Sequence, residues 1–212
     1  MKRTIVIVLA LISCVVAEAQ LRTIKPYYVF KVPNISAATY SGEFCDEDNP
    51  LYMDLYAPAP SWYDCGEVDN IAASSALRSQ GSASYKVGNI LDFNHETAWV
   101  EGVKGYGVGQ WIEFQGVRGG QITTINILNG YVKSDKAWNE NSRVRLLKVY
   151  CNGEPLCILE LNNSRSLQCF VVEELLDSYG VKTFRFEILD VYPGTKYQDT
   201  VISEIYFGGY CE

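Results

Sequence analysis

The chain contains a succession of short strand-forming runs with almost no helical pattern between them, and this feature restricts its fold the most. Each run is rich in Val, Ile, Tyr and Phe and is bounded by Gly, Asn, Asp or Pro, as β-strands are. Because strand follows strand without a crossover helix, the sequence predicts an all-β fold, an antiparallel β-sandwich or jelly roll. The predicted strands are residues 27–32, 110–114, 123–128, 144–150, 156–161, 168–172, 183–189 and 203–207.

The clearest local signal is a hairpin centred on Asn152 and Gly153. An Asn-Gly pair supplies the two positive φ angles of a type I′ turn, so the runs at 146–151 and 154–161 should pair across it. Short helical turns are expected at 87–91 and 172–178, the second ending before a glycine.

The first residues have the order of a secretory signal. Basic residues are followed by an apolar run and then by small residues, so residues 1–19 are predicted to be a signal peptide. Processing as a lipoprotein at Cys14 is the alternative, because residues 11–14 resemble a lipobox. No other segment is long and apolar enough to span a membrane, so the protein is expected to be secreted, periplasmic or on the cell surface.

Length and charge limit the remaining possibilities. The chain after the signal has the size of one domain, with an N-terminal arm or accessory strands at 20–65 and the sandwich at 66–212. The net charge is -7 and no basic run is present. Nucleic acid and anionic membranes are therefore poor partners, because both require a basic surface.

Six cysteines remain after Cys14, in a chain expected to be exported, where disulfides can form. No Cys-x-x-Cys spacing is present, so a zinc site is not indicated. The connectivity stays open from sequence, although Cys157 and Cys169 are expected to lie on adjacent strands and to pair.

Two groups of residues carry candidate binding chemistry. Asp92, Asn94 and Thr97 place carboxylate, amide and hydroxyl oxygens in one short loop, a set that suits Ca²⁺, although such residues also bond their own backbone in turns. Aromatic residues beside Gly, Lys, Asn or Pro form the second group, and an exposed ring next to polar donors suits a sugar. These are Tyr106, Tyr131, Trp138, Tyr192 and Tyr197.

Two other tryptophans, Trp99 and Trp111, are embedded in the strand pattern and are expected in the core. A single histidine, His95, excludes any mechanism that needs two, and no nucleophile elbow or phosphate-binding glycine loop is present. Hydrolysis by two carboxylates remains open, because any two acidic side chains could converge in a cleft.

Several blocks of the sequence resemble a known family. Residues 71–75, 89–99 and 202–205 resemble the discoidin fold, the factor V and VIII (F5/8) type C module, which is galactose-binding-like and also serves as a carbohydrate-binding module. Residues 99–114 and the blocks around Trp138 and Tyr197 look like the glycan-binding domain of streptococcal NAD-glycohydrolase toxins. The resemblance covers about residues 66–212 and does not extend to the enzymatic part of those toxins.

The resemblance implies a structural calcium ion and a disulfide. The calcium ligands that it implies are Asp92, Asn94, Thr97 and Glu204. Discoidin modules often join their first and last strands by a disulfide, which here implies Cys65 with Cys211.

The resemblance also implies a glycan partner bound by loops at one end of the sandwich, with no catalysis. The implied contacts are Tyr131, Lys133, Trp138, Asn141, Arg143, Tyr197 and Asp199. The alternatives are a protein-interaction or cell-surface adhesion module of the same fold, and a small glycosidase that uses two carboxylates.

Overall fold

The computed structural model describes residues 21–30, 68–92, 94–118, 121–175 and 180–210. The predicted signal peptide at 1–19, Cys14, most of the arm at 20–65 and the implied Cys65–Cys211 disulfide lie outside these ranges. None of the helices within them is long and apolar enough to cross a membrane.

Strands make up about half of the described chain and are its main regular structure. The strands are β1 (Thr23–Ile24), β2 (Tyr28–Phe30), β3 (Asn70–Ala73), β4 (Trp99–Val100), β5 (Trp111–Val117), β6 (Gln121–Asn129), β7 (Ser142–Cys151), β8 (Glu154–Glu160), β9 (Leu167–Val171), β10 (Lys182–Tyr192) and β11 (Thr200–Tyr210). One α-helix, α3 (Asp135–Glu140), and two 3-10 turns, η2 (Val87–Leu91) and η3 (Glu173–Leu175), are described.

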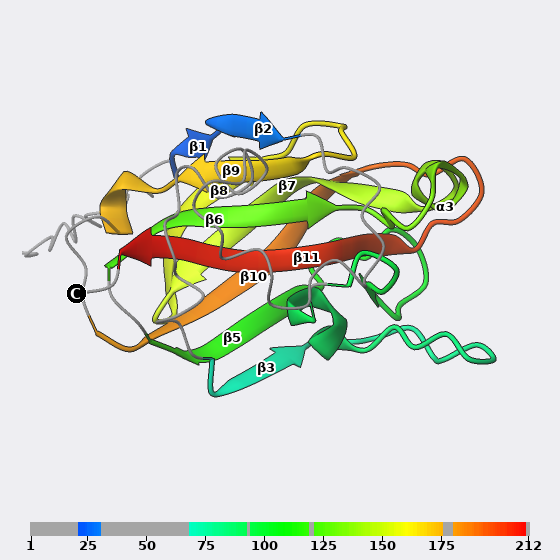
Figure 1. Cartoon of the computed structure of the whole chain (residues 1–212), viewed down its shortest axis with the longest axis horizontal. Coiled ribbons are helices and arrows are strands. Elements are labelled where there is room, and N and C mark those ends of the chain that lie inside the picture. Colours follow the sequence, from blue (N-terminus) through cyan, green and yellow to red (C-terminus); the bar gives the residue numbers. More distant parts are fainter. Residues whose placement is uncertain (1–20, 31–67, 93, 119–120, 176–179, 211–212) are drawn as a thin grey trace, which may run out of the picture.

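The strands form two layers joined at one corner. One layer has the order β2-β9-β6-β11, and the other contains β8, β7, β10, β5 and β3. Figure 1 shows β6 and β11 passing in front of β7 and β10. The first residues of β11 pair in parallel with the first residues of β7, whereas most other pairs are antiparallel. The predicted antiparallel β-sandwich is therefore confirmed.

The core lies between the layers because alternate residues of each strand point inward. From Trp111 to Phe114 in β5 and from Lys182 to Ile188 in β10 every second residue is buried, as the alternation requires. Phe207 of β11 meets the opposite layer directly, with its ring centroid 5.2 Å from that of Phe114 and 4.7 Å from that of Phe184. This aromatic cluster joins one sheet to the other.

All eight predicted strands are present, with boundaries shifted by a few residues. The hairpin is also confirmed: Asn152 and Gly153 have φ of 52° and 88°, and β7 pairs with β8 across them. The turn at 87–91 is η2, and the described part of 172–178 contains η3. Four elements were not predicted, namely β1, β3, β4 and α3, and each is six residues or shorter.

The predicted Cys157–Cys169 disulfide is wrong. Its premise was that the two residues lie on adjacent strands, but β8 pairs with β1 and β7, whereas β9 pairs with β2 and β6. Cys169 carries a free thiol. The hairpin fixes β8 as the neighbour of β7, and the chain then crosses to the other layer before β9 begins.

Burial raises the pKa of the Cys169 thiol to about 11. At pH 8 we expect Cys169 to react with iodoacetamide far more slowly in the folded protein than in denaturant, because the thiolate is the reactive form. The half-buried thiol of Cys151 is the matched control and should be labelled first. Site-resolved mass spectrometry measures both rates, and equal labelling of the two thiols in the folded protein would contradict this prediction.

The raised pKa of Cys169 also predicts how the free energy of unfolding changes at high pH. The unfolded chain releases the Cys169 proton near the ordinary thiol pKa, while the folded chain retains it up to a pKa of about 11. The free energy of unfolding therefore falls as pH rises from the ordinary thiol value toward 11.

The N-terminal residues 21–30 connect the free edges of the two layers. β1 pairs in parallel with β8, where Thr23 lies opposite Ile158. β2 pairs antiparallel with β9, where Val29 lies opposite Gln168. Figure 1 shows both blue strands along the same edge of the sandwich. This segment covers two edges that would otherwise expose unpaired backbone groups.

Candidate functional site

The short helix α3 lies at one end of the sandwich, between β6 and β7. Ser134 is its N-cap, and the hydroxyl oxygen accepts a hydrogen bond from the backbone N–H of Ala137 at 3.1 Å. Asp135 lies in the first turn, where its negative charge interacts favourably with the positive end of the helix dipole. At the other end, the side-chain amide of Asn141 donates to the carbonyl of Ala137 at 2.9 Å. The Ser-Asp pair is the sequence signal for this helix.

Arg143 completes the C-terminal cap of α3. Its Nη1 donates to the carbonyl oxygens of Trp138 at 2.8 Å and Asn141 at 2.9 Å, and its Nε donates to Oδ1 of Asn163 at 3.0 Å. A cation is favoured at this end of a helix. The residue is only 6% exposed, and burial lowers the pKa of its guanidinium. Arg143 therefore stabilises the C-terminal end of α3 from its buried side.

Trp138 packs between this guanidinium and a glycine. Arg143 Cζ lies 4.1 Å from the centre of the indole ring, and the indole N–H donates to the carbonyl of Asn129 at 3.1 Å. Gly130 has φ +79°, and a Cβ there would lie 2.8 Å from the indole. Only glycine combines this backbone angle with such a close approach. The indole is half-buried, with its position fixed from two sides.

The loop between β10 and β11 runs beside α3, as Figure 1 shows. The backbone N–H groups of Lys196 and Tyr197 both donate to the carbonyl of Glu140, at 3.1 and 2.8 Å. A Cβ on Gly194 would lie 2.4 Å from the carbonyl carbon of Asn141, so the loop and the helix end are in direct contact. The ring of Tyr197 is 41% exposed, with Lys196 Nζ 4.7 Å from its centre.

Most of the predicted glycan contacts therefore gather at one place. The helix end and the loop bring Trp138, Asn141 and Arg143 together with Tyr197, and Asp199 follows in the same loop. The backbone carbonyl of Asp199 accepts from Ser142 at 3.0 Å, which fixes the end of the loop to β7. We use the name α3 surface for the side chains of Lys133, Trp138, Asn141, Tyr197 and Asp199.

Tyr131 differs from the expectation of an exposed loop aromatic. It is 8% exposed and packs with Val100 and Val201, and its hydroxyl donates to the carbonyl of Glu96 at 3.3 Å. Exposed Lys133 lies over its ring, with Nζ 4.8 Å from the centre. Tyr131 thus supports this part of the surface, and Lys133 is the member of the pair that faces solvent.

The loop at 101–109, in which sequence reasoning had singled out only Tyr106, adds a further part to this end of the sandwich. Glu101 is fully buried, and its carboxylate accepts from the backbone N–H of Val103 at 2.8 Å and of Thr200 at 3.3 Å. Burial raises the pKa of this carboxyl group. Thr200 also donates to the carbonyl of Tyr106, so this loop is held beside the end of the β10–β11 loop. A glutamate with an ordinary sequence context gave no signal for this role.

Of the two tryptophans expected in the core, only Trp99 is there. Trp99 is fully buried, and its indole N–H donates to the carbonyl of Ser75 at 2.9 Å. Trp111 is half-buried, with the guanidinium of Arg185 4.3 Å from its ring centre. It begins β5, so its ring is covered by a neighbouring long side chain rather than by the opposite sheet.

The implied calcium loop forms a compact network of oxygens. The Asp92 carboxylate accepts from the Thr97 hydroxyl at 2.8 Å and from the Asn94 backbone N–H at 3.0 Å. These contacts also fit the simple turn in which Asp and Asn bond their own backbone. Among the described residues no three His, Cys, Asp or Glu side chains are placed to hold a metal together. An ion here would depend on amide, hydroxyl and backbone oxygens too.

Strand pairing brings Glu204 toward this loop. β4 and β11 are antiparallel, with Trp99 opposite Ile202 and Val100 opposite Val201. Continued by two residues, this register places Thr97 opposite Glu204. Glu204 is 1% exposed. A buried carboxylate on the strand next to a loop with three oxygen-bearing side chains has the donor chemistry that calcium uses, so the residue types fit the ion.

An antiparallel sandwich with a loop surface built on one end is the architecture of a discoidin-type, galactose-binding-like module. About half of the described residues are in β-strands and few are in helices. The chain belongs to the NAD glycohydrolase translocation F5/8 type C domain family, whose model matches residues 62–208.

Three solved structures are similar to this chain over much of its length. The structure of the CBM32-1, CBM32-2 and catalytic domains of Clostridium perfringens ZmpB covers 92% of this chain at 12% identity, with a TM-score of 0.50. A putative chitobiase fragment from Bacteroides thetaiotaomicron covers 69% of this chain and 90% of its own length, at 14% identity and a TM-score of 0.46. Arabinofuranosyltransferase AftD from Mycobacteria covers 68% of this chain at 18% identity, with a TM-score of 0.49.

At 12% identity the likeness to the Clostridium structure shows the fold alone. This chain corresponds to 18% of the Clostridium chain and to 11% of the AftD chain, which are much longer. A search of the curated proteins finds no match to the sequence.

Proposed function

We propose that this protein is an exported, non-catalytic module that binds carbohydrate on the α3 surface. The observation that carries the proposal is the exposed ring of Tyr197, on a loop that backbone hydrogen bonds tie to Glu140, at the end of the helix that carries Trp138. Family membership and the carbohydrate-binding-module fold support binding as the role. Binding at loops on a rigid sandwich is also how such scaffolds commonly work.

The chemistry of the surface suits a sugar. The C–H face of a pyranose ring would stack on Tyr197 or Trp138, while Lys133, Asn141 and Asp199 would bond its hydroxyl groups. Arg143 would act indirectly, because its guanidinium already caps α3 and is buried. Since the loop and the helix end are hydrogen-bonded before any ligand arrives, little ordering cost is added on binding.

The acidic side chains around the surface support a role without catalysis. Glu101 accepts two backbone N–H groups, Asp135 pairs with Arg165, and the Glu140 carboxylate lies 3.9 Å from Lys196. A glycosidase needs one carboxyl group as an acid and a second as a base or nucleophile across the scissile bond. These three carboxylates instead hold backbone or basic groups of the protein.

Tyr197→Ala is the direct test of this function. We expect a glycan that binds the protein on an array to lose about tenfold or more in affinity, because the exposed stacking face is removed. The melting temperature should change little, since the ring is 41% exposed. Val181→Ala is the matched control, because Val181 is exposed and lies just before β10, at the strand end opposite this loop. Isothermal titration calorimetry measures both affinities, and no glycan hit on the array would exclude the proposal.

A protein-interaction module is the second candidate, and the loop at 101–109 is the observation that favours it. Val103, Tyr106 and Val108 are all exposed large apolar side chains within this one loop. Clustered exposed apolar residues are typical of interaction sites. A protein partner that is captured equally well with and without competing sugar, and is lost in Val108→Asp, would support this candidate over carbohydrate binding.

We further propose that Asp92, Asn94, Thr97 and Glu204 hold a structural Ca²⁺ ion, some of them through backbone oxygens. Bound there, the ion would supply positive charge for the buried Glu204 carboxylate and would tie the loop before β4 to β11. With the ion bound, its four protein ligands would keep the 92–97 loop in one conformation. The role of the ion would be structural, because it would join two segments that are distant in the sequence.

Calcium is expected to raise the thermal stability of the protein. An ion at about 100 times its dissociation constant adds about 2.7 kcal/mol to the free energy of unfolding, provided that it binds only the folded state. Asp92→Asn should remove most of the calcium-dependent rise in melting temperature. Differential scanning calorimetry with CaCl₂ and with EDTA makes the measurement, with MgCl₂ as the control ion. Identical melting curves under all three conditions would contradict the site.

A further inference from the structure

The N-terminal segment builds a pocket on the flank of the sandwich, outside the α3 surface. The pocket has a volume of about 570 Å³, within the range of small-ligand sites. Most of its lining residues lie in 22–27, ahead of the family-matched region at 62–208. It is lined by Arg22, Thr23, Ile24, Lys25, Tyr27, Val171 and Glu173.

Both ends of the lining segment are fixed to the two sheets. The carbonyl of Arg22 accepts a hydrogen bond from Ile158 N–H of β8 at 2.9 Å. The N–H of Tyr27 donates to the carbonyl of Cys169 in β9 at 2.8 Å. Pro26 further restricts the backbone between these points. The pocket wall is therefore in place without a ligand.

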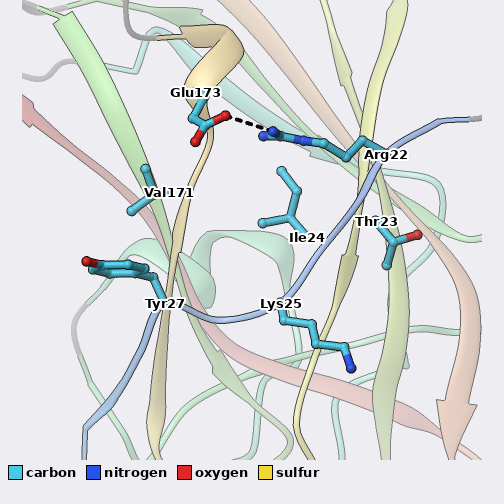
Figure 2. Close-up of a pocket in the computed structure, with 7 residues that line it drawn as sticks. All are labelled: Arg22, Thr23, Ile24, Lys25, Tyr27, Val171 and Glu173. Atoms are coloured by element: carbon cyan, nitrogen blue, oxygen red, sulfur yellow. Dashed lines mark hydrogen bonds and ion pairs between the residues drawn. The ribbon is translucent and has the colours of Figure 1, made fainter.

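Because side chains alternate along an extended segment, one face of residues 22–27 lines the pocket. Arg22 and Ile24 point to the side of Glu173 and Val171, while Lys25 extends away from the ion pair (Figure 2). Arg22 Nη1 and Glu173 Oε2 are 2.8 Å apart, and both side chains are substantially exposed. Their fixed arrangement presents guanidinium donors and carboxylate acceptors next to each other.

An exposed aromatic ring completes the set. Tyr27 is 67% exposed, and Figure 2 places its ring on the same side of the pocket as Val171. A ring with an aliphatic neighbour offers a flat apolar face beside the polar pair. We propose that this pocket is a second carbohydrate site, which binds one or two rings of a neutral pyranose sugar.

The chemistry favours a neutral sugar over a charged one. Vicinal hydroxyl groups both donate and accept, so one pair of them can bond to Arg22 and Glu173 together without separating the ion pair. A sugar carboxylate would have to displace Glu173 from Arg22, and the whole chain has a net charge of -7. The apolar C–H face of the pyranose would rest on Tyr27. This site does not depend on the ligand of the α3 surface.

The test is NMR titration of the ¹⁵N-labelled protein with maltose, cellobiose, lactose and chitobiose, each to about 10 mM, so that even a site with a dissociation constant of about 1 mM is mostly occupied. Galacturonic acid is the charged comparison. We expect at least one neutral disaccharide to shift the backbone amides of the pocket residues. No shift from any neutral disaccharide, or shifts from galacturonic acid alone, overturns the proposal.

Point variants then locate the contact. Tyr27→Ala should weaken the disaccharide about tenfold or more, and Tyr27→Phe should retain it, because the ring is kept. Val181→Ala is the control and should leave the affinity unchanged, since Val181 is also an exposed apolar side chain but does not line the pocket. Unchanged affinity in Tyr27→Ala would also overturn the proposal.

The Tyr197→Ala variant distinguishes sugar binding in this pocket from sugar binding at the α3 surface. The pocket amide shifts should persist in that variant, because the two sites share no residue. Their loss would mean that one site at the loop end accounts for all binding, which overturns a second site. If the α3 surface binds no sugar and the pocket still does, the proposed function fails while this inference stands.

Discussion

Phe207→Ala is expected to lower the free energy of unfolding by about 3–5 kcal/mol, the largest effect of a single substitution that we foresee. Phe207 is 2% exposed, and its ring contacts Phe114, Phe184 and Phe186 from the opposite sheet. Removing the ring leaves a cavity where the two layers meet. Urea denaturation followed by tryptophan fluorescence measures the change, because Trp99 is in the same core.

Phe207→Leu is the matched variant, since it retains most of the apolar volume and should cost clearly less than the alanine substitution. A loss below about 1 kcal/mol for Phe207→Ala would show that the layers do not depend on this cluster. Because whole domains are stable by only about 5–15 kcal/mol, the alanine variant should also unfold at a markedly lower temperature.

Arg143→Ala is expected to lower the free energy of unfolding by about 2–3 kcal/mol and to weaken glycan binding as well. The substitution leaves the carbonyl oxygens of Trp138 and Asn141 without their charged donor and removes the guanidinium from beneath the indole. The end of α3 should loosen, and with it the contact to the β10–β11 loop. Calorimetry gives the melting temperature, and titration with the bound glycan gives the affinity.

Comparing Arg143→Ala with Tyr197→Ala distinguishes a residue that supports the surface from a residue that contacts the glycan. A supporting residue changes stability and binding together, whereas an exposed contact residue changes binding alone. Arg143→Lys keeps the charge but cannot donate in the planar geometry of a guanidinium, so it should restore only part of the stability. If Arg143→Ala leaves the melting temperature unchanged and abolishes binding, then Arg143 contacts the sugar directly and our assignment of its role is wrong.

The strands could be predicted from the sequence because their signals are local. β-Branched and aromatic residues alternate with polar ones over four or more positions in β6, β7 and β10, and the Asn152-Gly153 turn fixes its hairpin without help from the rest of the chain. The short strands β1 and β4 contain two residues each, too few for a pattern to show. They form because a neighbouring strand already offers hydrogen-bonding groups.

Which strands become neighbours depends on contacts distant in the sequence. Cys157 and Cys169 looked adjacent because they lie in consecutive strands, yet their strands belong to different layers. In the same way, no property of residues 22–27 alone indicates that they join β8 to β9 and line a pocket. Both outcomes depend on how the two sheets come together.

The sequence by itself determined the class of fold, the hairpin and the family, because strand propensity, turn chemistry and motif blocks are properties of neighbouring residues. It also predicted that the segments of Trp138 and Tyr197 lie at one end of the sandwich, and the structure places them together there. Only the tertiary structure decided which of those side chains face solvent. Arg143 and Tyr131 were predicted as contacts and are buried, since the carbonyls of α3 and the residues around Val201 take up their polar and apolar groups. Burial is set by packing between segments far apart in the chain, and a linear pattern does not contain that information.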